Sequence, residues 1–394
     1  MSDVAERLEE LRDRGLHRQL RLIEGPQGPS VTLDGHPVLL LCSNNYLGLA
    51  DRAEVREAAA EAALRWGAGS GASRLISGNM EPHRQLEQRL AAFKGYEAAL
   101  LFGSGYLANT GLIPALAGKC EVVFSDELNH ASIVDGCRLS RAETFVYRHR
   151  DLEHLAWALY HQRGKPALIV TDGVFSMDGD VAPLPELLEL ARRHGARLMV
   201  DEAHATGAIG PGGRGSVAAA GLSGEVDVVV GTLGKALGSY GAYACADPET
   251  IDFLVNSARP FIFSTAPPPP AMGAALAALE RLEAEPELVE RLQANARTLR
   301  TALAAEGLGT GTSQSQVVPI PVGDAGAAMA LCEDALRRRV FAQGIRPPTV
   351  PEGSCRLRCT VMATHKAQEL VWAARQVGAA AREVGLLEQR ALAA

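Results

Sequence analysis

Seven short apolar runs recur between residues 97 and 246, and most of them are separated by segments whose apolar residues return every three or four positions. The runs are EAALLF, EVVFSD, ETFVYRH, PALIVTD, ARLMVDE, VDVVVGT and GAYACA. Short apolar runs predict strands, and the intervening periodicity predicts helices. Because strands that alternate with helices form a parallel sheet covered on both faces, we expect an α/β fold with a mostly parallel central sheet.

The segments on either side of these runs have a different pattern. A charged, helix-patterned start is followed by VTLDGHPVLLL, which predicts a hairpin turning at Asp34-Gly35. Four prolines at 267–270 precede a long Ala/Leu/Glu-rich helix, and then come a strand, a helix, a proline turn, the strand CRLRCTVM and a last helix. The expected parts are an N-terminal helix and hairpin segment (1–45), a large domain (46–282) and a small α+β domain (283–394).

Composition narrows the class of protein. Of 394 residues, 47% are hydrophobic and 22% charged, with a net charge of −7, which argues against broad nucleic-acid binding. No apolar run approaches the length of a membrane span, and the N-terminal residues lack the apolar core of a signal peptide. The seven cysteines form no CxxC pair and no metal-ligand cluster. We therefore expect a cytoplasmic protein with reduced thiols and no bound metal.

The letters DEAH occur in VDEAHATG and also mark nucleic-acid motors, in which the first carboxylate helps to hold magnesium. Such a motor needs GxxxxGK[ST] upstream. The candidate GTLGKALG lies downstream of Asp201, with Ala236 after its lysine and Val229 where the first glycine should be. The sequence therefore argues against a magnesium site at Asp201.

The same residues suit another cofactor. Asp201 ends one apolar run, His204 follows it, and Lys235 follows the next run between Gly234 and Ala236. Ligands of open α/β sheets bind beyond the carboxyl ends of the strands. A lysine with an aspartate on an adjacent strand end is the pair that pyridoxal phosphate requires, and the strand–turn–helix pattern of FGSGYLANTG would supply a phosphate site at a helix N-terminus.

In this order, the motifs resemble those of the α-oxoamine synthases, pyridoxal-phosphate enzymes of the aspartate-aminotransferase fold (fold type I) that condense an amino acid with an acyl thioester. The matching stretches are SNNYLGLA, GSGASRLISGN, FGSGYLAN, SDELNHASIVDGCRLS, TDGVFSMDGDVAPL, VDEAHATGAIG and GTLGKALG. NSARPFIFSTAPPP and IRPPTVPEG look most like the biotin-pathway branch, which joins L-alanine to pimeloyl-CoA or pimeloyl-acyl-carrier protein. The branch that uses glycine and acetyl-CoA, or a dual specificity, remains the alternative.

The resemblance implies a set of cofactor contacts. Lys235 matches the lysine that binds the coenzyme covalently and then acts as the base, Asp201 the partner of the ring nitrogen, and His204 the partner of its phenolic oxygen. His130 matches the histidine stacked on the ring and could hydrogen-bond a forming oxyanion. The remaining cofactor contacts are Ser104, Gly105, Tyr106, Ser176, Thr232 and, from a neighbouring subunit, Thr265.

Substrate contacts follow in the same way. Arg358 matches the arginine that binds the amino acid's carboxylate, although Arg356 should point to the same side of the strand. Arg18 or Arg21 would meet the acyl carboxylate or the coenzyme A. Asn44 and Thr349 complete the expected substrate contacts. The family also implies a homodimer in which residues 66–79 contribute to the partner's site.

Overall fold

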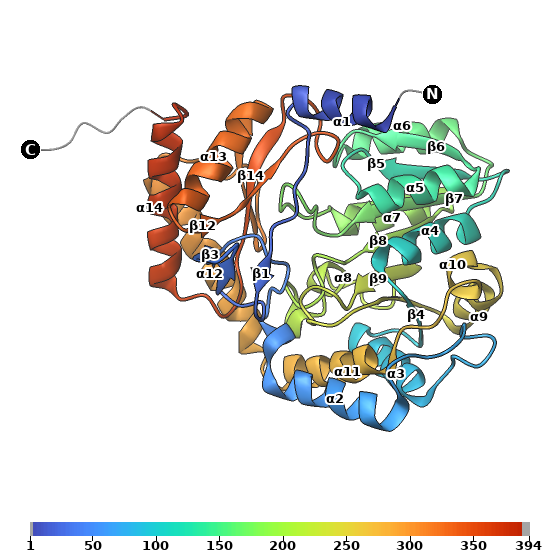
Figure 1. Ribbon diagram of the computed structural model, residues 1–394. Coiled ribbons are helices and arrows are strands. Elements are labelled where there is room, and N and C mark those ends of the chain that lie inside the picture. The colour runs from blue at the N-terminus through green and yellow to red at the C-terminus, as the bar shows by residue number, and fades with distance from the viewer. Residues whose placement is uncertain (1–2, 388–394) are drawn as a thin grey trace, which may run out of the picture. The chain divides into compact units, whose positions relative to one another are not determined.

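The computed structural model describes residues 3–387, and its contacts divide the chain into two compact units (Figure 1). Unit 2 comprises Leu47–Ser176 and Asp180–Glu290. Unit 1 comprises the residues up to Tyr46, the short stretch Met177–Gly179 and the residues from Arg291 onward. The N-terminal helix and hairpin therefore share a unit with the residues from Arg291 onward.

Unit 2 is built around a seven-stranded sheet. Its order is β4-β10-β9-β8-β7-β5-β6, and β10 is antiparallel to both of its neighbours. All seven predicted strands are present, and the expectation of a mostly parallel sheet is confirmed. Their bounds are β4 Ala98–Phe102, β5 Val122–Asp126, β6 Glu143–Tyr147, β7 Ala167–Asp172, β8 Arg197–Asp201, β9 Val228–Thr232 and β10 Ala242–Ala246.

Helices cover both faces of this sheet because alternate strand residues point to opposite sides. Val123, Val170 and Met199 pack in one apolar cluster, whereas their neighbours Ile169 and Leu198 pack in another. The first cluster includes residues of α4, α5, α9 and α10, and the second includes residues of α6 and α7. The helices of unit 2 are α2 Ala53–Trp66, α3 Glu81–Lys94, α4 Gly105–Leu116, α5 Ala131–Ser140, α6 Leu152–His161, α7 Leu184–His194, α8 Ser216–Ala219, α9 Pro248–Ser257, α10 Arg259–Ile262 and α11 Pro269–Ala284, with 3₁₀ turns at Leu49–Asp51 and Pro211–Gly213.

Unit 1 contains two smaller sheets. The first has the order β1-β2-β3-β12, in which the predicted hairpin at Asp34-Gly35 joins β2 to β3, and β12 pairs with β3 in parallel. The second is the antiparallel sheet β11-β14-β13. The elements are α1 Val4–Asp13, β1 Ile23–Glu24, β2 Ser30–Leu33, β3 His36–Leu40, β11 Val317–Gly323, α13 Ala325–Arg337, β12 Val340–Phe341, β13 Gln343–Ile345, β14 Cys355–Thr360 and α14 Ala367–Glu383.

One predicted helix is in fact two. The Ala/Leu/Glu-rich segment after the prolines begins as α11 at Pro269, where a proline is tolerated in the first helical turn. It ends at Ala284, and α12 (Glu287–Ala305) begins just after Pro286. Pro286 ends the first helix because it has no N–H for the helical hydrogen bond and restricts the residue before it. The expectation of a single long helix is therefore wrong at this point.

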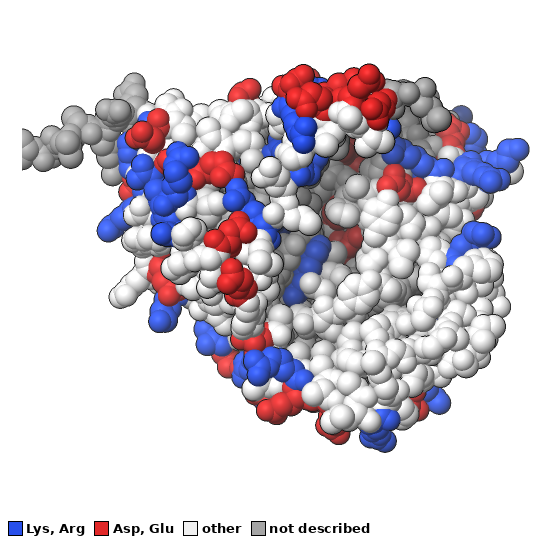
Figure 2. All heavy atoms as spheres, in the orientation of Figure 1, with Lys and Arg blue, Asp and Glu red and all other residues white. Residues whose placement is uncertain are grey.

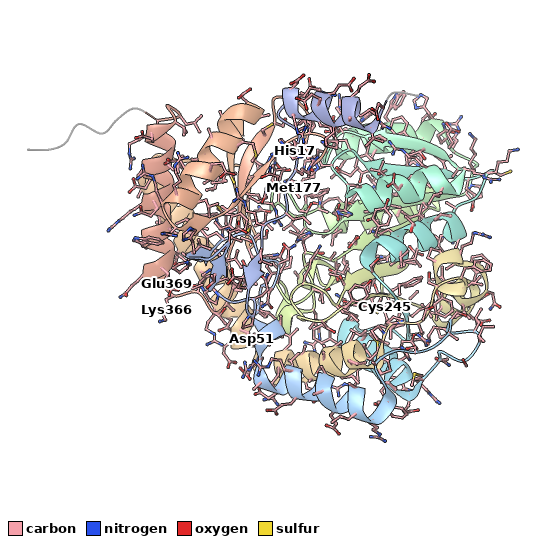
Figure 3. The ribbon with its side chains drawn as sticks, in the orientation of Figure 1. His17, Asp51, Met177, Cys245, Lys366 and Glu369 are labelled. Carbon is pink, nitrogen blue, oxygen red and sulfur yellow. The ribbon has the colours of Figure 1, made fainter. Side chains whose placement is uncertain are left out.

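Within residues 3–387 no helix is long and apolar enough to span a membrane. The seven cysteines, including Cys245 (labelled in Figure 3) on β10, are all free thiols.

Candidate active site

Two aspartates lie side by side at the carboxyl edge of the large sheet. Asp172 ends β7 and Asp201 ends β8, and the two residues are paired in the parallel register. Burial and the charge of Asp201 raise the pKa of Asp172 well above its ordinary value. Of two like charges this close, one takes up a proton far more readily. Asp172 therefore takes up a proton more readily than an ordinary aspartate.

Asp201 has fixed hydrogen-bond partners. Asn109 Nδ2 on α4 donates to its Oδ2 at 2.7 Å, and the N–H of Ala203 donates to its Oδ1 at 2.8 Å. Asp201 is only 3% exposed. Among residues 3–387 no group of three His, Cys, Asp or Glu is arranged to hold a metal ion. Asp201 is therefore a buried side chain with a fixed orientation at a strand end.

Lys235 lies three residues after β9, the strand next to β8. Its Nζ is 2.8 Å from Nε2 of His204, which is buried in the turn that follows Asp201. The two turns pack closely: Gly207 has φ +75°, and a Cβ on it would lie 2.5 Å from the Cβ of Ala236. Only glycine fits there, since a side chain would be strained and would push the two turns apart.

His130 is held from both sides at the start of α5. Its backbone N–H donates to Oδ2 of Asp172 at 2.7 Å, and its Nδ1 lies 2.7 Å from Oγ of Ser132. Burial lowers the pKa of His130; the charge of Asp201 opposes this shift, and that of Lys235 adds to it. At neutral pH the ring is therefore uncharged.

The predicted phosphate turn precedes a helix as expected. Ser104 is the N-cap of α4, and its Oγ accepts the N–H of Leu107 at 3.2 Å. Gly105 opens the helix with nothing close to the position of a Cβ, and Tyr106 is half-exposed and donates from its hydroxyl to Asp135. The free N–H groups of the first turn make this end a ready anion site.

Three further predicted contacts lie in unit 2. Thr232 ends β9, and its hydroxyl donates to Gly241 O at 3.0 Å. Ser176 is buried. Thr265 is exposed and forms a bridge to Ser73 in the glycine-rich stretch.

The predicted substrate residues belong to unit 1. Arg358 is buried on β14, and its Nη2 lies 3.4 Å from Oδ1 of Asn44, so the structure brings these two together. Arg356, on the same strand, is ion-paired with Asp178 and donates to the carbonyl of Met177 (labelled in Figure 3) at 3.2 Å. The ion pair distinguishes two arginines that the register left equivalent.

Arg18, Arg21 and Thr349 line one cavity of about 680 Å³ in unit 1, together with His17 (labelled in Figure 3). Arg18 donates to the carbonyl of Pro347 at 3.2 Å, and Arg21 pairs with Glu333. The cavity also holds Arg346, which is buried. Its guanidinium reaches the carbonyl of His17, whereas its Nε has no hydrogen-bond partner among the described residues.

Sequence reasoning missed Asn109, Ser132, Asp172 and Arg346. All four stand in or next to stretches quoted for the resemblance, yet their roles depend on which strand ends become neighbours. Ser132 illustrates this: Asn109 Nδ2 donates to its Oγ at 2.9 Å, so one serine joins α4 to His130.

Residues 36–377 match the family described as aminotransferase class I and II. The chain belongs to this family. The 8-amino-7-oxononanoate synthase of Citrifermentans bemidjiense is 53% identical over 98% of this chain and 100% of its own length, and that of Geobacter metallireducens is 54% identical over 97% and 99%. Within the family, these relatives place the chain among the α-oxoamine synthases.

Solved structures agree with this family membership. A serine palmitoyltransferase from S. paucimobilis, solved with pyridoxal phosphate and myriocin bound, superposes with a TM-score of 0.92 at 35% identity, covering 98% of each chain. An 8-amino-7-oxononanoate synthase from Francisella tularensis has a TM-score of 0.76 at 28% identity, covering 88% of this chain and 98% of its own. The aspartate-aminotransferase-like fold is confirmed, and the family depends on pyridoxal phosphate.

The residues present fit that coenzyme. An amine, a buried carboxylate and a histidine lie at adjacent strand ends, and a capped helix N-terminus lies on the same sheet edge. Asn109 Oδ1, on the residue that orients Asp201, is buried without a hydrogen-bond partner among residues 3–387. Lys235 would hold the coenzyme covalently, Asp201 would meet its ring nitrogen, and Ser104 with Gly105 would face its phosphate.

Proposed function

We propose that this chain is a cytoplasmic, pyridoxal-phosphate-dependent acyltransferase. Its reaction condenses L-alanine with a pimeloyl thioester, on coenzyme A or acyl-carrier protein, and releases carbon dioxide and the free thiol to give 8-amino-7-oxononanoate for biotin biosynthesis. The observation that carries this proposal is the pairing of Lys235 with His204 beside an oriented Asp201, in a chain 53% identical to synthases of that name.

When bound, pyridoxal phosphate supplies an electron sink for the α-carbon of the amino acid. Lys235 Nζ, as a free amine, removes the proton from that carbon. His204 Nε2, 2.8 Å away, keeps the amine in place and can exchange a proton with it. Asp201, fixed by Asn109 and the Ala203 N–H, keeps a negative charge where the ring nitrogen needs a proton.

His130 is suited to donate a hydrogen bond rather than to carry charge. Its Nδ1 accepts the backbone N–H of Ser132 at 3.2 Å, so the proton of the neutral ring lies on Nε2. An Nε2–H aimed at the thioester oxygen would stabilise the oxyanion that forms there, an effect of about 3 kcal/mol for a well-placed donor.

Unit 1 supplies the recognition of anions. Arg358, the arginine to which the resemblance assigns this role, would bind the carboxylate of L-alanine, because a guanidinium can form two parallel hydrogen bonds to a carboxylate. Arg356 is ion-paired with Asp178. The cavity lined by Arg18, Arg21, Thr349 and Arg346 would receive the far carboxylate of the pimeloyl group or the phosphates of coenzyme A.

A second copy of the chain completes the site in this proposal. Ile76 is 80% exposed in the glycine-rich stretch, and Phe263 is 70% exposed two residues before Thr265, to which that stretch is bridged. Figure 2 shows a wide area without Lys, Arg, Asp or Glu over the part of unit 2 around α10 and β4. An uncharged area rimmed by polar residues is typical of a subunit interface.

The test is the Lys235→Ala variant of the full chain. We expect the wild-type protein to bind pyridoxal phosphate with a yellow absorbance that borohydride abolishes. The variant should lose that absorbance and turnover while its circular dichroism in the far ultraviolet is unchanged. Exposed Lys119, replaced by alanine, is the control. Condensation activity retained by Lys235→Ala would overturn the proposal.

The substrate assignment is tested separately. Initial rates with L-alanine and pimeloyl-CoA are compared with rates for glycine and acetyl-CoA, and we expect the first pair to have the higher kcat/KM. One methyl group accounts for only about 1–3 kcal/mol of discrimination, so a measurable rate with glycine is compatible with the assignment. A clear preference for the second pair would make the chain a 2-amino-3-ketobutyrate CoA ligase instead.

A further inference from the structure

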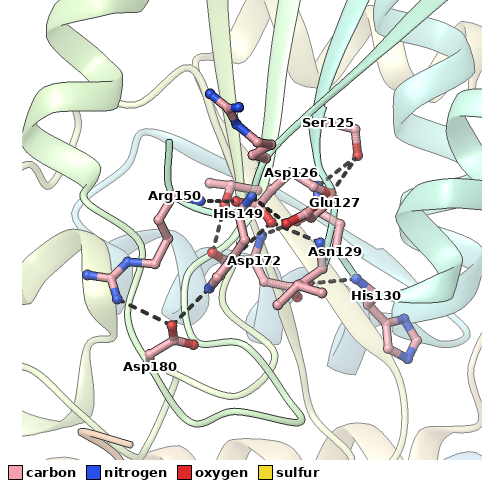
Figure 4. A network of polar contacts seen from close by, with 12 residues as sticks. Ser125, Asp126, Glu127, Asn129, His130, His149, Arg150, Asp172 and Asp180 are labelled. Carbon is pink, nitrogen blue, oxygen red and sulfur yellow. Dashed lines mark hydrogen bonds and ion pairs between the residues drawn. The ribbon is translucent and has the colours of Figure 1, made fainter. Parts of the chain in front are cut away.

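A single imidazole joins two buried carboxylates next to the proposed site. His149 follows β6, and its Nδ1 lies 2.9 Å from Oδ1 of Asp126 while its Nε2 lies 2.9 Å from Oδ2 of Asp180 (Figure 4). Both carboxylates are almost fully buried. No role in binding or chemistry follows from the family motifs for any of these three residues.

The geometry requires a doubly protonated ring. An ionised carboxylate only accepts hydrogen bonds, so each ring nitrogen must donate. Burial opposes the charge, but the two carboxylates outweigh it and raise the pKa of His149 to about 9. The other groups that face the ring are Arg150, which also reaches Asp180 at 3.3 Å, and the edge-on ring of Phe175, with centroids 4.4 Å apart. The imidazolium is therefore the stable form at neutral pH.

The carboxylate of Asp126 leads to His130. It accepts the N–H of Leu128 at 2.9 Å and so shapes the turn that follows β5. In that turn Asn129 donates to Val170 O at 2.8 Å and accepts the N–H of Asp172 at 2.9 Å, and His130 N donates to Asp172. A displacement at Asp126 would therefore reach the ring of His130 through three consecutive residues.

Asp180, which holds the other ring nitrogen through its carboxylate, is linked toward Ser176 through its backbone. Asp180 accepts the N–H of Phe175 through its backbone carbonyl at 3.0 Å, and Val174 bridges to Val181. These bonds close the base of a narrow hairpin in which Ser176 follows Phe175. His149 thus contacts both the base of this hairpin and the turn that presents His130.

We propose that the His149 imidazolium is a positioning residue that sets the distance between His130 and Ser176, and thereby the position of the coenzyme ring between them. This inference rests on the proposed function, because the resemblance to the α-oxoamine synthases makes both residues contacts of the coenzyme that this function requires. His149 touches neither substrate nor coenzyme. It acts through Asp126 and Asp180, whose mutual repulsion it neutralises.

The first measurement needs no coenzyme. The histidine ring nitrogens are observed by nitrogen-15 NMR during a pH titration. The signals of His149 are assigned as those that are missing in His149→Gln. We expect both ring nitrogens to carry protons at pH 7.5 and to titrate near pH 9. A ring that titrates near 6.5 would overturn the inference and leave the proposed function intact, whereas wild-type protein that fails to take up pyridoxal phosphate would instead sink the proposed function.

The second measurement uses His149→Gln, with exposed His161→Gln as the matched control. The neutral amide can donate to one carboxylate but turns its oxygen to the other, so the two carboxylates should move apart. We expect weaker binding of pyridoxal phosphate, an altered visible circular dichroism of the bound coenzyme and a kcat up to about a hundredfold lower, with KM for L-alanine little changed. Wild-type values for all of these in a folded His149→Gln would contradict the positioning role.

A second substitution separates positioning from mere stability. In His149→Gln/Asp180→Asn the new side-chain amide can donate to the glutamine oxygen, which restores an unbroken row of hydrogen bonds without charge. The amide nitrogen would take the place of Oδ2, the atom that meets the ring of His149, and the amide oxygen that of Oδ1, which has no hydrogen-bond partner among the described residues. The contact of 3.3 Å between Arg150 and Oδ2 would be given up. We expect the double variant to regain much of the visible dichroism and kcat lost in the single variant. A double variant no better than the single one would overturn the inference.

Discussion

Glu202, the residue directly after Asp201, illustrates how much of the site rests on single buried side chains. Its carboxylate is fully buried, accepts from Ser216 Oγ and Val217 N at 2.7 Å, and forms an ion pair with Lys94 of α3. Lys94 also donates to the carbonyl of Arg214. Every polar atom of the pair is used, so the turn that carries Asp201 and His204 is tied to α3.

Replacing only the lysine of this ion pair should destabilise the fold strongly. We expect Lys94→Met to lower the free energy of unfolding by about 3–5 kcal/mol, because it leaves a buried carboxylate uncompensated. Lys94→Met/Glu202→Gln should recover part of that loss, since the neutral amide still accepts from Val217. Chemical denaturation of the holoenzyme measures both. The control is Lys165→Met, which breaks an exposed pair with Glu143 and should change stability by less than about 1 kcal/mol.

Site residues could be predicted from the sequence where a chemically suitable side chain stands at the end of an apolar run. Asp201 and Lys235 each follow an apolar run, so their place at the sheet edge could be predicted before any distance was known. The strand register could not separate Arg356 from Arg358, and only the resemblance chose Arg358; the contact of Arg356 with Asp178 is a three-dimensional feature that distinguishes them. Asn109 and Asp172 were missed because an asparagine on a helix and a second strand-end aspartate have many ordinary uses.

Among the elements, α4 has two tasks. Its N-terminus is capped by Ser104, and the same turn is the proposed phosphate site. The hydroxyl of Ser104 therefore contributes both to the stability of the helix and to the binding of the coenzyme. Helix α9, in the same unit, begins with a comparable cap, Asp247, which accepts the N–H of Thr250 at 2.8 Å. The two helices therefore offer a matched comparison.

Ser104→Ala and Asp247→Ala should each cost about 1 kcal/mol of stability, the usual value of an N-cap. Only Ser104→Ala should also weaken the binding of pyridoxal phosphate, because its hydroxyl faces the phosphate in the proposed site. Equilibrium titration followed by visible absorbance checks this difference. An equal loss of affinity in both variants would show that the effect is one of stability alone.

The strands of unit 2 were predictable as elements because buried parallel strands are continuous apolar runs with clear ends. Within unit 1 the hairpin of β2 and β3 was predictable, but the pairings between distant segments were not. Strand β12 has two residues, and its parallel partner β3 lies three hundred positions earlier, a distance over which no local pattern carries information. The break between α11 and α12 was visible as Pro286, yet the composition on both sides favoured one helix.

At the scale of the whole molecule, the proposed second copy can be tested at Ile76. We expect the wild-type chain to sediment as a dimer and Ile76→Asp to shift toward the monomer, because a charge placed in an apolar interface must be desolvated. Activity should fall in parallel, since residues 66–79 would no longer reach the partner's site.

The control is Trp372→Asp, at a partly exposed position on α14 of unit 1. This variant should leave both the sedimentation and the activity unchanged. A wild-type chain that is monomeric and fully active would contradict the dimer.

The pairing of β3 with β12 also dictates an order of events during synthesis. Leu39 and Leu40 pair with Val340 and Phe341, so the sheet that β1, β2 and β3 begin is not completed until residue 341 has been synthesised. Unit 2, apart from the insertion at Met177–Gly179, is finished by Glu290 and can collapse first. Until then the apolar side of the N-terminal hairpin remains uncovered. In a chain truncated before residue 340, this apolar side would stay exposed permanently.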